Sequence, residues 1–458
     1  MIHIKNTDRL IANASTGTIQ NARTIALRTL EHTLNSIDAD KLLKAKVTLK
    51  DRRLHVNPYT FDLSQFLNIY VVGGGKAAAL MALALEEILG KNITRGHVNA
   101  PYGDKAKTHI IKLNESSHPV PDESGVKGAK RMMEISGRAD KDDLVIVLIS
   151  GGGSSLMPLP RDGISLNDKR ELTAKLLKCG ATIGEINAVR KHLSCFKGGW
   201  LAKKAYPATV LNLIISDVVG DALESIASGP TVPDSTTFAD ARKILERYAL
   251  WADAPVSIRK LIIDGENGLI EETPKPGSEC FKKVYSVVLG NCHSAALAAV
   301  KSLKAEGFNT LLLTSSLEGE ARTVGTMLSS IAAEIDSSGN PVPKPAAVVV
   351  GGETVVTVRG SGKGGRNQEL LLSAALKLQG TGSTVMASLS TDGVDGPTDS
   401  AGAIVDGATV ERGKRLGLDA EKSLIDNDSY GFFSRLGDVI VTGPTGTNVN
   451  DISLIIVP

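Results

Sequence analysis

Two glycine-rich turns in the first half of the chain carry side chains that could bind an anion. Each follows an apolar run typical of a β-strand. Residues 69–72 lead into three glycines and Lys76, and residues 144–149 lead into three further glycines followed by Ser154 and Ser155. Glycine lets backbone approach a ligand closely, and N–H groups at such turns attract anions. A purely structural turn is the alternative for both. The residues expected at the anion are Gly74, Gly75, Lys76, Gly152, Gly153, Ser154 and Ser155.

A third candidate, residues 347–369, lies in the second half of the chain. Its sequence, AVVVGGETVVTVRGSGKGGRNQE, combines an apolar strand, a glycine break followed by Glu353, a glycine loop, and Arg366 and Asn367 at the start of a helix. Because glycine loops and helix N-termini both suit anions, the stretch predicts part of a phosphate-handling site. A hairpin with a flexible tip is the alternative.

Carboxylates also follow predicted strands. Asp217 comes directly after the apolar run 210–215, and Asp392 and Asp395 lie in the segment 390–399. An acid at the carboxyl end of a buried parallel strand points into the crevice where open α/β sheets bind ligands. Such carboxylates can hold hydrated Mg²⁺ or accept a proton from a hydroxyl group. The alternatives are an N-cap role for Asp217 and a solvated acidic turn for the other two.

Phosphoryl transfer is the chemistry that this set of residues fits. It needs positioned cations, Mg²⁺ and a residue that receives a hydroxyl proton, with little covalent chemistry by the protein. The loop 443–450 adds Thr447 and Asn448, which could contact a ligand or simply close a hairpin. The sequence shows no GxSxG elbow, no Cys–His pair with nucleophile spacing, and no GxGxxG followed by an acid about 20 residues later.

The elements that must position these residues alternate between strands and helices. This alternation predicts an α/β fold with mainly parallel sheets and helices on both faces. A polar, proline-containing stretch at 263–283 indicates a connection between domains. We therefore expect a first domain over 1–240, a connecting segment over 241–283 and a second domain over 284–458. Strand ends of the two sheets would then border a cleft that holds the active site.

Composition and charge indicate a globular protein with small-molecule partners. The 458 residues are 42% hydrophobic and 22% charged, which is typical of a globular chain. Lys and Arg number 52 against 50 Asp and Glu, so nothing favours a nucleic-acid partner. No apolar run reaches about 18 residues, so no membrane helix is expected. The four scattered cysteines suggest reduced thiols and a cytoplasmic protein. The acid-free, arginine-containing stretch 9–30 faintly resembles a transit peptide but also fits an amphipathic helix.

The motifs together resemble the type II glycerate 2-kinases, whose C-terminal half is the MOFRL domain. They span about residues 15–458 in the family's order, and their combination is specific where any single one would be weak. The motifs are VVGGGKA (71–77), SSHPVPDESG (116–125), LISGGGSSL (148–156), INAVRKHLS (186–194), ISDVVGD (215–221), SGPTVPD (228–234), VGGETVVTV (350–358), GKGGRNQE (362–369), STDGVDGPTDSAG (390–402) and GPTGTNVND (443–451).

The resemblance implies ATP-dependent, Mg²⁺-assisted phosphorylation of D-glycerate at its 2-hydroxyl, giving 2-phosphoglycerate and ADP. It also implies a Rossmann-like N-terminal domain and a MOFRL-type C-terminal domain on either side of the active cleft. Carried over by motif, Lys76 and Arg366 are expected at the phosphate oxygens. Asp392 is expected to accept the 2-hydroxyl proton, and Asp217 competes with it for that role or for Mg²⁺.

Further residues receive binding roles by the same resemblance. Ser154, Ser155, Arg190 and Lys191 are candidates for the glycerate carboxylate or the phosphates, and Asp217 and Asp395 are the candidate metal ligands. Glu353, Asn367, Thr447 and Asn448 complete the candidate binding set.

Two other functions compete with the kinase. Hydroxypyruvate reductase, a name that relatives carry, would need NAD(P)H, and the missing GxGxxG argues against it. A non-catalytic sugar-acid-binding module would not need clustered acids beside Lys and Arg. The expected partners are small molecules, D-glycerate and ATP, together with a second copy of the chain in a homodimer; no nucleic acid or membrane is expected.

Overall fold

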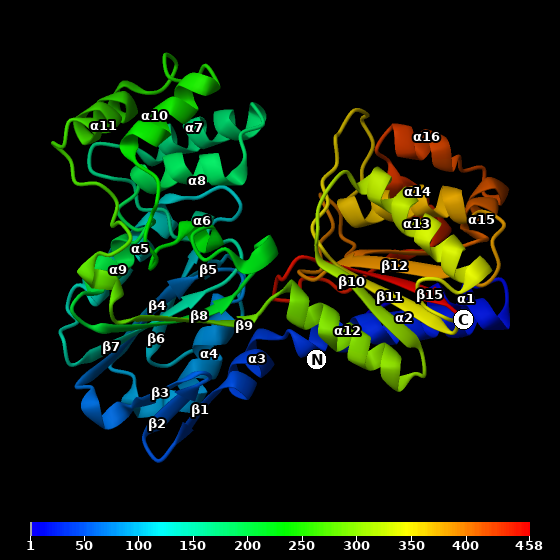
Figure 1. Cartoon of the computed structure of the whole chain (residues 1–458), viewed down its shortest axis with the longest axis horizontal. Helices are drawn as coiled ribbons and strands as arrows, with labels where there is room; N and C mark the ends of the chain where they lie inside the picture. Colours follow the sequence, from blue (N-terminus) through cyan, green and yellow to red (C-terminus); the bar gives the residue numbers. More distant parts are fainter. Residues whose placement is uncertain (1) are drawn as a thin grey trace. The chain divides into compact units, whose positions relative to one another are not determined.

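A computed structural model describes residues 2–458 and divides the chain into two compact units (Figure 1). One unit is Ala39–Leu289, and the other joins the chain up to Asp38 to Gly290–Pro458. The predicted boundaries at 240 and 284 differ from this division. Strand β9 (Val284–Gly290) belongs to the first sheet as its sixth strand. The N-terminal helices pack in the unit formed mainly by the C-terminal half of the chain.

The sheet of the first unit has the strand order β6-β5-β4-β7-β8-β9. The pairs from β6 through β8 are all parallel, as predicted. Helices α4 (Ala78–Leu89) and α5 (Glu123–Ser136) pack against its strands, and Figure 1 shows them on opposite faces. Because helices cover both faces of the sheet, β4 and β7 are buried on both sides and carry continuous apolar runs. The strands are β4 (Asn68–Gly74), β5 (Arg95–Pro101), β6 (Ile111–Ser116), β7 (Asp143–Ile149), β8 (Thr209–Ile215) and β9.

A layer of helices in the same unit has a hydrophobic core of its own. Its members are α7 (Leu166–Lys178), α8 (Ile183–His192), α10 (Phe238–Arg247) and α11 (Val256–Glu266). Helix α8 ends at His192, and the next helix, α9 (Trp200–Ala205), begins eight residues later. Gly198 and Gly199 between them have φ of 58° and 85°, which breaks the helix. The remaining elements are α3 (Ala39–Lys46), a small antiparallel sheet of β1 (Val47–Lys50), β2 (Arg53–Val56) and β3 (Tyr59–Asp62), and α6 (Gly153–Leu156).

The sheet of the second unit is mixed, which corrects the prediction of a mainly parallel one. Its order is β10-β11-β15-β12-β13-β14, and only β10 and β11 form a parallel pair. The C-terminal strand β15 (Asp451–Val457) runs antiparallel between β11 and β12, and β12 turns back into β13 through the loop 391–401. This loop contains no crossover helix of the kind that usually joins parallel strands, which favours antiparallel pairing. The other strands are β10 (Asn309–Leu317), β11 (Ala346–Gly352), β12 (Val385–Ser390), β13 (Gly402–Asp406) and β14 (Val439–Ile440).

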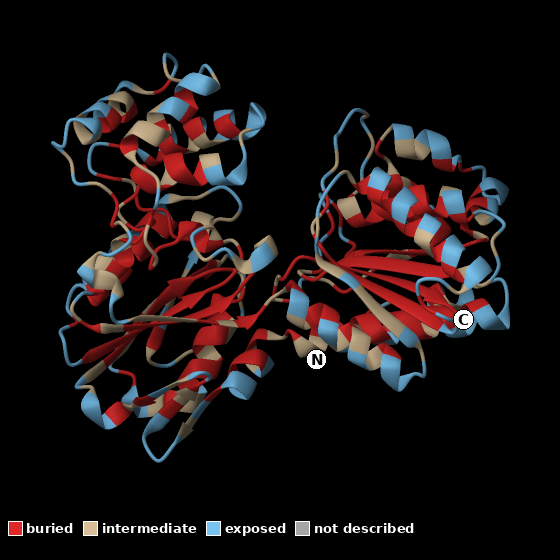
Figure 2. Cartoon of the chain, in the orientation of Figure 1, coloured by how far each residue is buried: buried red, intermediate tan, exposed pale blue. Residues whose placement is uncertain are grey.

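Helices cover both faces of this second sheet. Helices α13 (Ala321–Ser338) and α14 (Arg366–Leu378) pack on one face, and α2 (Gly17–Ser36) and α12 (Cys292–Ala305) pack on the other (Figure 1). Figure 2 shows the strands as the most continuously buried part of each unit. The smaller helices are α1 (Thr7–Ala12), α15 (Thr409–Arg415), α16 (Ala420–Ile425) and α17 (Ser429–Leu436).

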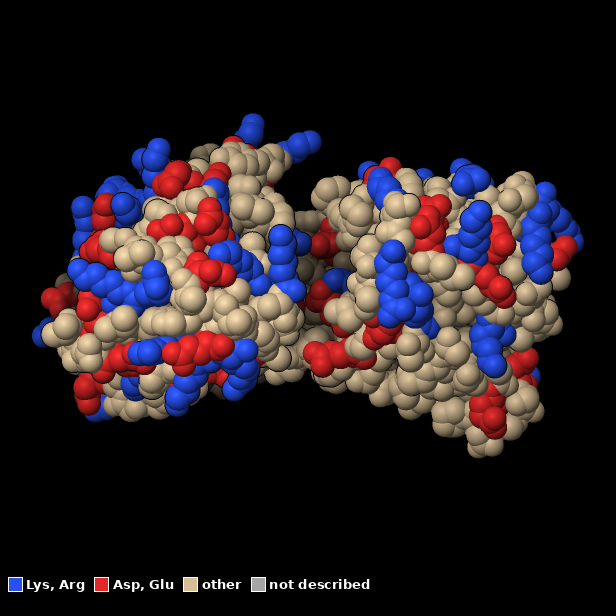
Figure 3. Space-filling view, turned by 90° about the horizontal axis from the view of Figure 1, so that it is seen from above, with Lys and Arg blue, Asp and Glu red and all other residues tan. Residues whose placement is uncertain are grey.

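Acidic and basic side chains are interspersed over the face shown in Figure 3. Within residues 2–458, every helix is too short or too polar to cross a lipid bilayer.

A buried arginine joins α2 to the second sheet. Arg23 is 0% exposed, and its Nε donates to Asp406 Oδ2 at 2.8 Å while its Nη1 donates to Asp438 Oδ1 at 3.0 Å. The same guanidinium also donates to the carbonyl oxygen of Leu10 at 2.8 Å. Because both carboxylates are completely buried as well, the pairs are shielded from solvent.

Replacing Arg23 is therefore expected to destabilise this unit. Arg23→Ala leaves the buried carboxylate of Asp406 without its arginine. Asp438 keeps its pair with Arg412. Breaking a buried ion pair in this way costs about 3–5 kcal/mol in free energy of unfolding. Urea unfolding followed by far-ultraviolet circular dichroism measures the change. Arg28→Ala, an exposed arginine on the same helix, is the matched control and should shift stability by less than about 0.5 kcal/mol. Equal effects of the two substitutions would contradict a special role for the buried pairs.

Candidate active site

The two glycine turns of the first unit meet at one edge of its sheet. Strands β4 and β7 pair in parallel, with Gly74 opposite Ile149, so their carboxyl ends are adjacent. The backbone N–H of Lys76 donates to the carbonyl of Gly151 at 2.8 Å. A Cβ at Gly75 would lie 2.1 Å from Ser150 Oγ. Glycine is thus required there by the close approach of the second turn, and the two turns form a single surface.

Gly152 lies between the side chains of Lys76 and His118. Gly152 has φ of 79°, and a Cβ built on it would lie 2.8 Å from His118 Nε2 and 3.5 Å from Lys76 Cγ. The lysine stem and the imidazole therefore border the same glycine. This places His118 beside the turns.

Hydrogen bonds fix Ser154 against two other segments. Its Oγ lies 2.8 Å from Ser228 Oγ, and Ser228 donates in turn to Asn187 Oδ1 at 3.0 Å. The carbonyl oxygen of Ser154 accepts a hydrogen bond from Lys197 Nζ at 2.7 Å. The hydroxyl turn after β7 is thereby held to α8 and to the loop before α9.

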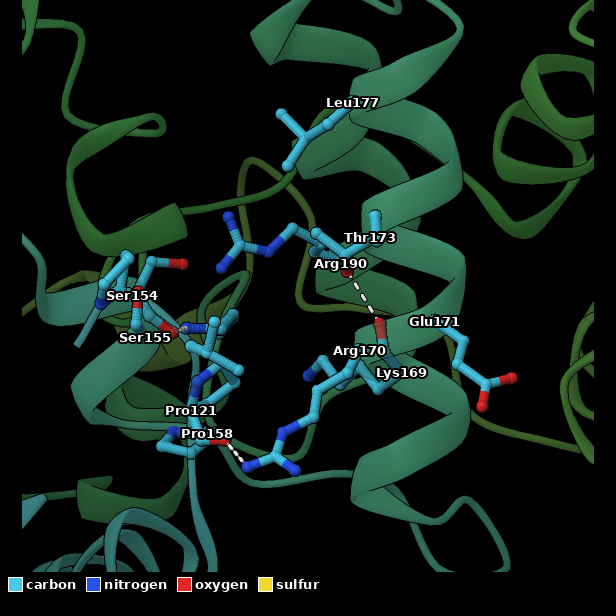
Figure 4. Close-up of a pocket in the computed structure, with 14 residues that line it drawn as sticks. Pro121, Ser154, Ser155, Pro158, Lys169, Arg170, Glu171, Thr173, Leu177 and Arg190 are labelled. Atoms are coloured by element: carbon cyan, nitrogen blue, oxygen red, sulfur yellow. Dashed lines mark hydrogen bonds between the residues drawn. The ribbon is translucent and has the colours of Figure 1, made fainter. Parts of the chain in front are cut away.

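A cavity of about 450 Å³ opens beside this turn (Figure 4). The guanidinium of Arg190 extends from α8 toward the segment that carries Ser154 and Ser155, whereas the carboxylate of Glu171 points to the opposite side of α7. Arg170 lies at the rim and donates to the carbonyl of Pro121. The remaining lining residues are Pro119, Val120, Pro158, Lys169, Thr173, Ala174, Leu177 and Lys197.

Three basic side chains, Lys169, Arg190 and Lys197, line the cavity. Burial, reinforced by the charge of Arg190, lowers the pKa of Lys169 to about 7, and burial lowers the pKa of Arg190 to about 10. Burial, with the charges of Arg190 and Lys169, also holds the pKa of Lys197 well below its usual value. Among residues 2–458, no carboxylate forms an ion pair with any of these three cations. An anionic ligand in the cavity would favour the protonated, charged forms of these side chains.

The second unit holds another set of predicted site residues, also at one edge of its sheet. Because β15 is antiparallel to its neighbours, its first residue, Asp451, lies opposite Gly352 at the end of β11 and Ser390 at the end of β12. Arg366, the first residue of α14, donates from Nε and Nη2 to the two oxygens of Asp451 at 2.6 and 2.8 Å. Burial raises the pKa of Asp451 to about 7, although Arg366 opposes the shift.

Glu353 completes this arrangement and borders a second cavity. One of its oxygens accepts from Arg366 Nη1, and the other accepts from Asn450 Nδ2 at 2.7 Å. Both Glu353 and Arg366 line a cavity of about 490 Å³, together with Gly362, Gly364 and Gly365 of the glycine loop. The glycine loop, Glu353 and Arg366 therefore line one cavity, and their role at a phosphate stays a prediction.

Asp392 and Asp395 occupy different environments in the loop after β12. Asp392 is half-buried, and its Oδ1 accepts hydrogen bonds from Ser390 Oγ at 2.9 Å and from the backbone N–H of Val394 at 3.0 Å. Asp395 is buried, and its two oxygens accept from the backbone N–H groups of Asn367 and Gln368 at the start of α14. Asp395 thus caps a helix, while Asp392 is the carboxylate with partial access to solvent.

Comparisons with known proteins cover almost the whole chain. Residues 25–263 match the model of a domain of unknown function, DUF4147, and residues 346–451 match that of the MOFRL family. A protein named glycerate 2-kinase from Pyrococcus horikoshii is 44% identical, over 95% of this chain and 97% of its own length. The crystal structure of a glycerate kinase from Thermotoga maritima superposes with a TM-score of 0.83 at 41% identity, covering 95% of this chain and 99% of that one.

The chain belongs to the MOFRL-containing glycerate kinase family. One further relative, from Agrobacterium vitis, carries a provisional hydroxypyruvate reductase name and is 43% identical over 84% of this chain and 86% of its own. Family membership also confirms the predicted two-domain α/β fold.

Several residues predicted for this glycerate kinase site have internal partners instead of an open position. Lys191, next to Arg190, is buried and donates to Asp234 Oδ1 at 3.4 Å. Thr447 is buried and donates to the carbonyl of Ile37 at 3.1 Å. Asn367 is buried between Asp395 and Ser388. Their binding roles stay predictions, and the contacts show what each side chain does without a ligand.

Other predicted residues lie where a ligand could reach them. Asn448 is half-buried and accepts from the backbone N–H of Asn450 at 3.2 Å. Asp217 is half-buried in the loop after β8, at the same edge of the sheet as the turns after β4 and β7. The contribution of Asp217 to the glycerate kinase site stays a prediction.

The sequence did not single out three residues of these sites. Lys169 lies in a helix whose sequence, LNDKRELTAKLLK, reads as a solvated charged surface, and Lys197 lies in the glycine interruption before α9. Asp451 begins an apolar strand, and only the motif GPTGTNVND marked its position. The sequence does not reveal that a lysine is buried, because the long stem of an ordinary surface lysine also covers apolar residues while its charge stays in water.

Proposed function

We propose that this protein is a glycerate 2-kinase, which transfers the γ-phosphoryl group of ATP to the 2-hydroxyl of D-glycerate and releases 2-phosphoglycerate and ADP. The observation that carries the proposal is the 44% identity to a glycerate 2-kinase over nearly the full length of both chains. The cavity beside Ser154, lined by basic side chains, supports it, because phosphoryl transfer requires cations positioned around phosphate groups.

Roles within the reaction follow from position and chemistry. Lys76, beside the glycine turns, and Arg366, at the start of α14, are assigned to the phosphate oxygens. Asp392 is assigned as the acceptor of the 2-hydroxyl proton, with Asp217 as the competing candidate. Each of these residues lies at the edge of a sheet where ligands of α/β proteins bind, which supports the assignment.

Mg²⁺ is part of the proposal because kinases use it to neutralise phosphate charge. Among residues 2–458, no cluster of three or more His, Cys, Asp or Glu side chains has metal-binding geometry. Mg²⁺ usually needs only one or two carboxylates in addition to water and substrate phosphates. Asp217 fits that requirement, whereas both oxygens of Asp395 are committed to α14.

Hydroxypyruvate reductase is the second candidate, because the relative from Agrobacterium vitis carries that name. A dinucleotide site would use a GxGxxG turn between a strand and a helix. The corresponding turn here, between β4 and α4, reads GGGKAA, with alanine in place of the third glycine, and the next strand, β5, has no acid that could bind a ribose hydroxyl. The second turn, after β7, packs against the first through Gly75. This geometry favours the kinase.

One assay separates the two functions. With D-glycerate, ATP and Mg²⁺, the kinase should form ADP and a phosphate ester whose phosphorus couples to a single proton in ³¹P spectra, as in 2-phosphoglycerate. Coupling to two protons would indicate the 3-phosphate and contradict the proposed regiochemistry. L-Glycerate and a reaction containing EDTA are the controls, and both should give little product. Oxidation of NADH by hydroxypyruvate with no ADP formed would overturn the kinase assignment.

A further inference from the structure

Three cations from separate segments converge on the cavity of the first unit. Lys169 comes from α7, Arg190 from α8, and Lys197 from the loop before α9. Lys169 and Lys197 are only 6% and 1% exposed. Their ammonium groups donate to backbone carbonyls alone, Lys169 to Leu193 at 3.4 Å and Lys197 to Ser154 at 2.7 Å. Burial of ammonium groups without a countercharge is unfavourable, so such clusters mark functional sites.

Nearby carboxylates are engaged with other groups. Asp234 accepts from Lys191 and from Thr273, and Glu272 pairs with His192. Glu171 also lines the cavity, but its carboxylate points away from Arg190 (Figure 4). The described part of the chain thus supplies no acid to the three cations, and a ligand must supply the negative charge.

The dimensions of the cavity indicate how much ligand it holds. Its volume of about 450 Å³ falls in the range of pockets for drug-sized ligands, about 300–1,000 Å³. A three-carbon acid with a single carboxylate would leave most of that volume empty and most of the positive charge unbalanced. Apolar side chains form the rest of the wall, and two of them, Val120 and Leu177, are 57% and 62% exposed. A ligand with several negative charges at one end and a flat apolar group at the other matches both features.

We infer that this cavity binds the phosphate donor, with Lys169, Arg190 and Lys197 around its polyphosphate chain and the nucleoside against Val120, Pro121, Ala174 and Leu177. The inference rests on the proposed kinase function and goes beyond it by placing the nucleotide. It adds Lys169 and Lys197 to the site and leaves Lys191 out. The hydroxyl turn at Ser154 and Ser155 leads back through Gly152 to Lys76, so the transferring end of the chain lies on that side.

Binding measurements on the full-length protein test this placement. Tripolyphosphate should bind the wild type and compete with ATP in isothermal titration calorimetry. Lys169→Met and Arg190→Gln should each weaken ATP and tripolyphosphate about ten- to hundredfold, the range expected for a hydrogen bond to a charged group. The KM for D-glycerate should stay within about twofold. Lys178→Met removes an exposed lysine from the same helix and should leave every affinity unchanged.

Thermal unfolding provides a readout that a structural role would not give. A buried ammonium without a countercharge destabilises the folded state, so Lys169→Met should raise the unfolding temperature of the ligand-free protein while weakening ATP. A lower unfolding temperature with unchanged ATP affinity would overturn the inference. Loss of D-glycerate affinity with normal ATP affinity would also overturn it and assign the cavity to the acceptor. If the wild type binds ATP but makes no ADP with D-glycerate, the proposed function fails and the nucleotide site stands.

Discussion

Arg366→Ala should lower kcat by about 10³–10⁵-fold, which is the contribution of arginines that stabilise charge in phosphoryl transfer. In the structure, three N–H groups of the guanidinium donate to Asp451 and Glu353, and one N–H on each terminal nitrogen remains for a ligand. The two carboxylates hold the guanidinium in place at the wall of its cavity. A phosphate oxygen placed there would therefore meet a preorganised donor, which is the condition for strong transition-state stabilisation.

Steady-state kinetics with saturating ATP and D-glycerate measure the effect. Arg359→Ala is the matched control, because Arg359 is exposed in the segment that precedes the glycine loop. Arg366→Lys retains the charge but loses the bidentate pair with Asp451, so it should recover only part of the rate. A fall of less than about tenfold in Arg366→Ala, with an intact circular dichroism spectrum, would remove Arg366 from the transferring phosphate.

Asp392→Asn should reduce turnover by about 10²–10⁴-fold, the usual contribution of a general base, and leave ATP affinity nearly unchanged. The amide keeps the size of the carboxylate but cannot take the proton of the 2-hydroxyl. Asp392 is half-buried and oriented by Ser390 and the N–H of Val394, so its position does not depend on its charge alone.

The control for Asp392 lies in the same loop. Asp399 is exposed, and its Oδ1 accepts a hydrogen bond from the hydroxyl of Tyr430 at 2.6 Å. Asp399→Asn should keep normal kcat and KM. If Asp392→Asn also turned over normally, the role of base would pass to Asp217, and Asp217→Asn would then be the variant to measure.

Much of the first sheet could be predicted from the sequence because its strands are buried on both faces. Such strands read as continuous apolar runs that end in glycine or serine, as at 144–149. The order and direction of the strands in the second sheet could not be predicted in this way. Its central position is filled by the last strand of the chain, β15, and pairing between segments so distant leaves no local pattern.

The same reasons explain which site residues were predicted. Lys76, Ser154 and Arg366 adjoin glycine turns, which mark ligand approach in the sequence. Neighbouring residues on a helix point in different directions, so the pattern could not separate Arg190, which lines the cavity, from Lys191, which is buried against Asp234. Asp451 reaches Arg366 only because β15 is antiparallel to β11 and β12.

The place of α2 in the second unit has a consequence for biosynthesis. Arg23 leaves the ribosome 415 residues before Asp438, the carboxylate with which it pairs. At about 5–20 residues per second, this interval is roughly 20–80 s. During that time the unit Ala39–Leu289 can complete its own sheet, while the apolar face of α2 has no sheet to cover. The nascent chain therefore exposes the apolar face of α2, a suitable binding site for a chaperone, until the strands of the second sheet emerge.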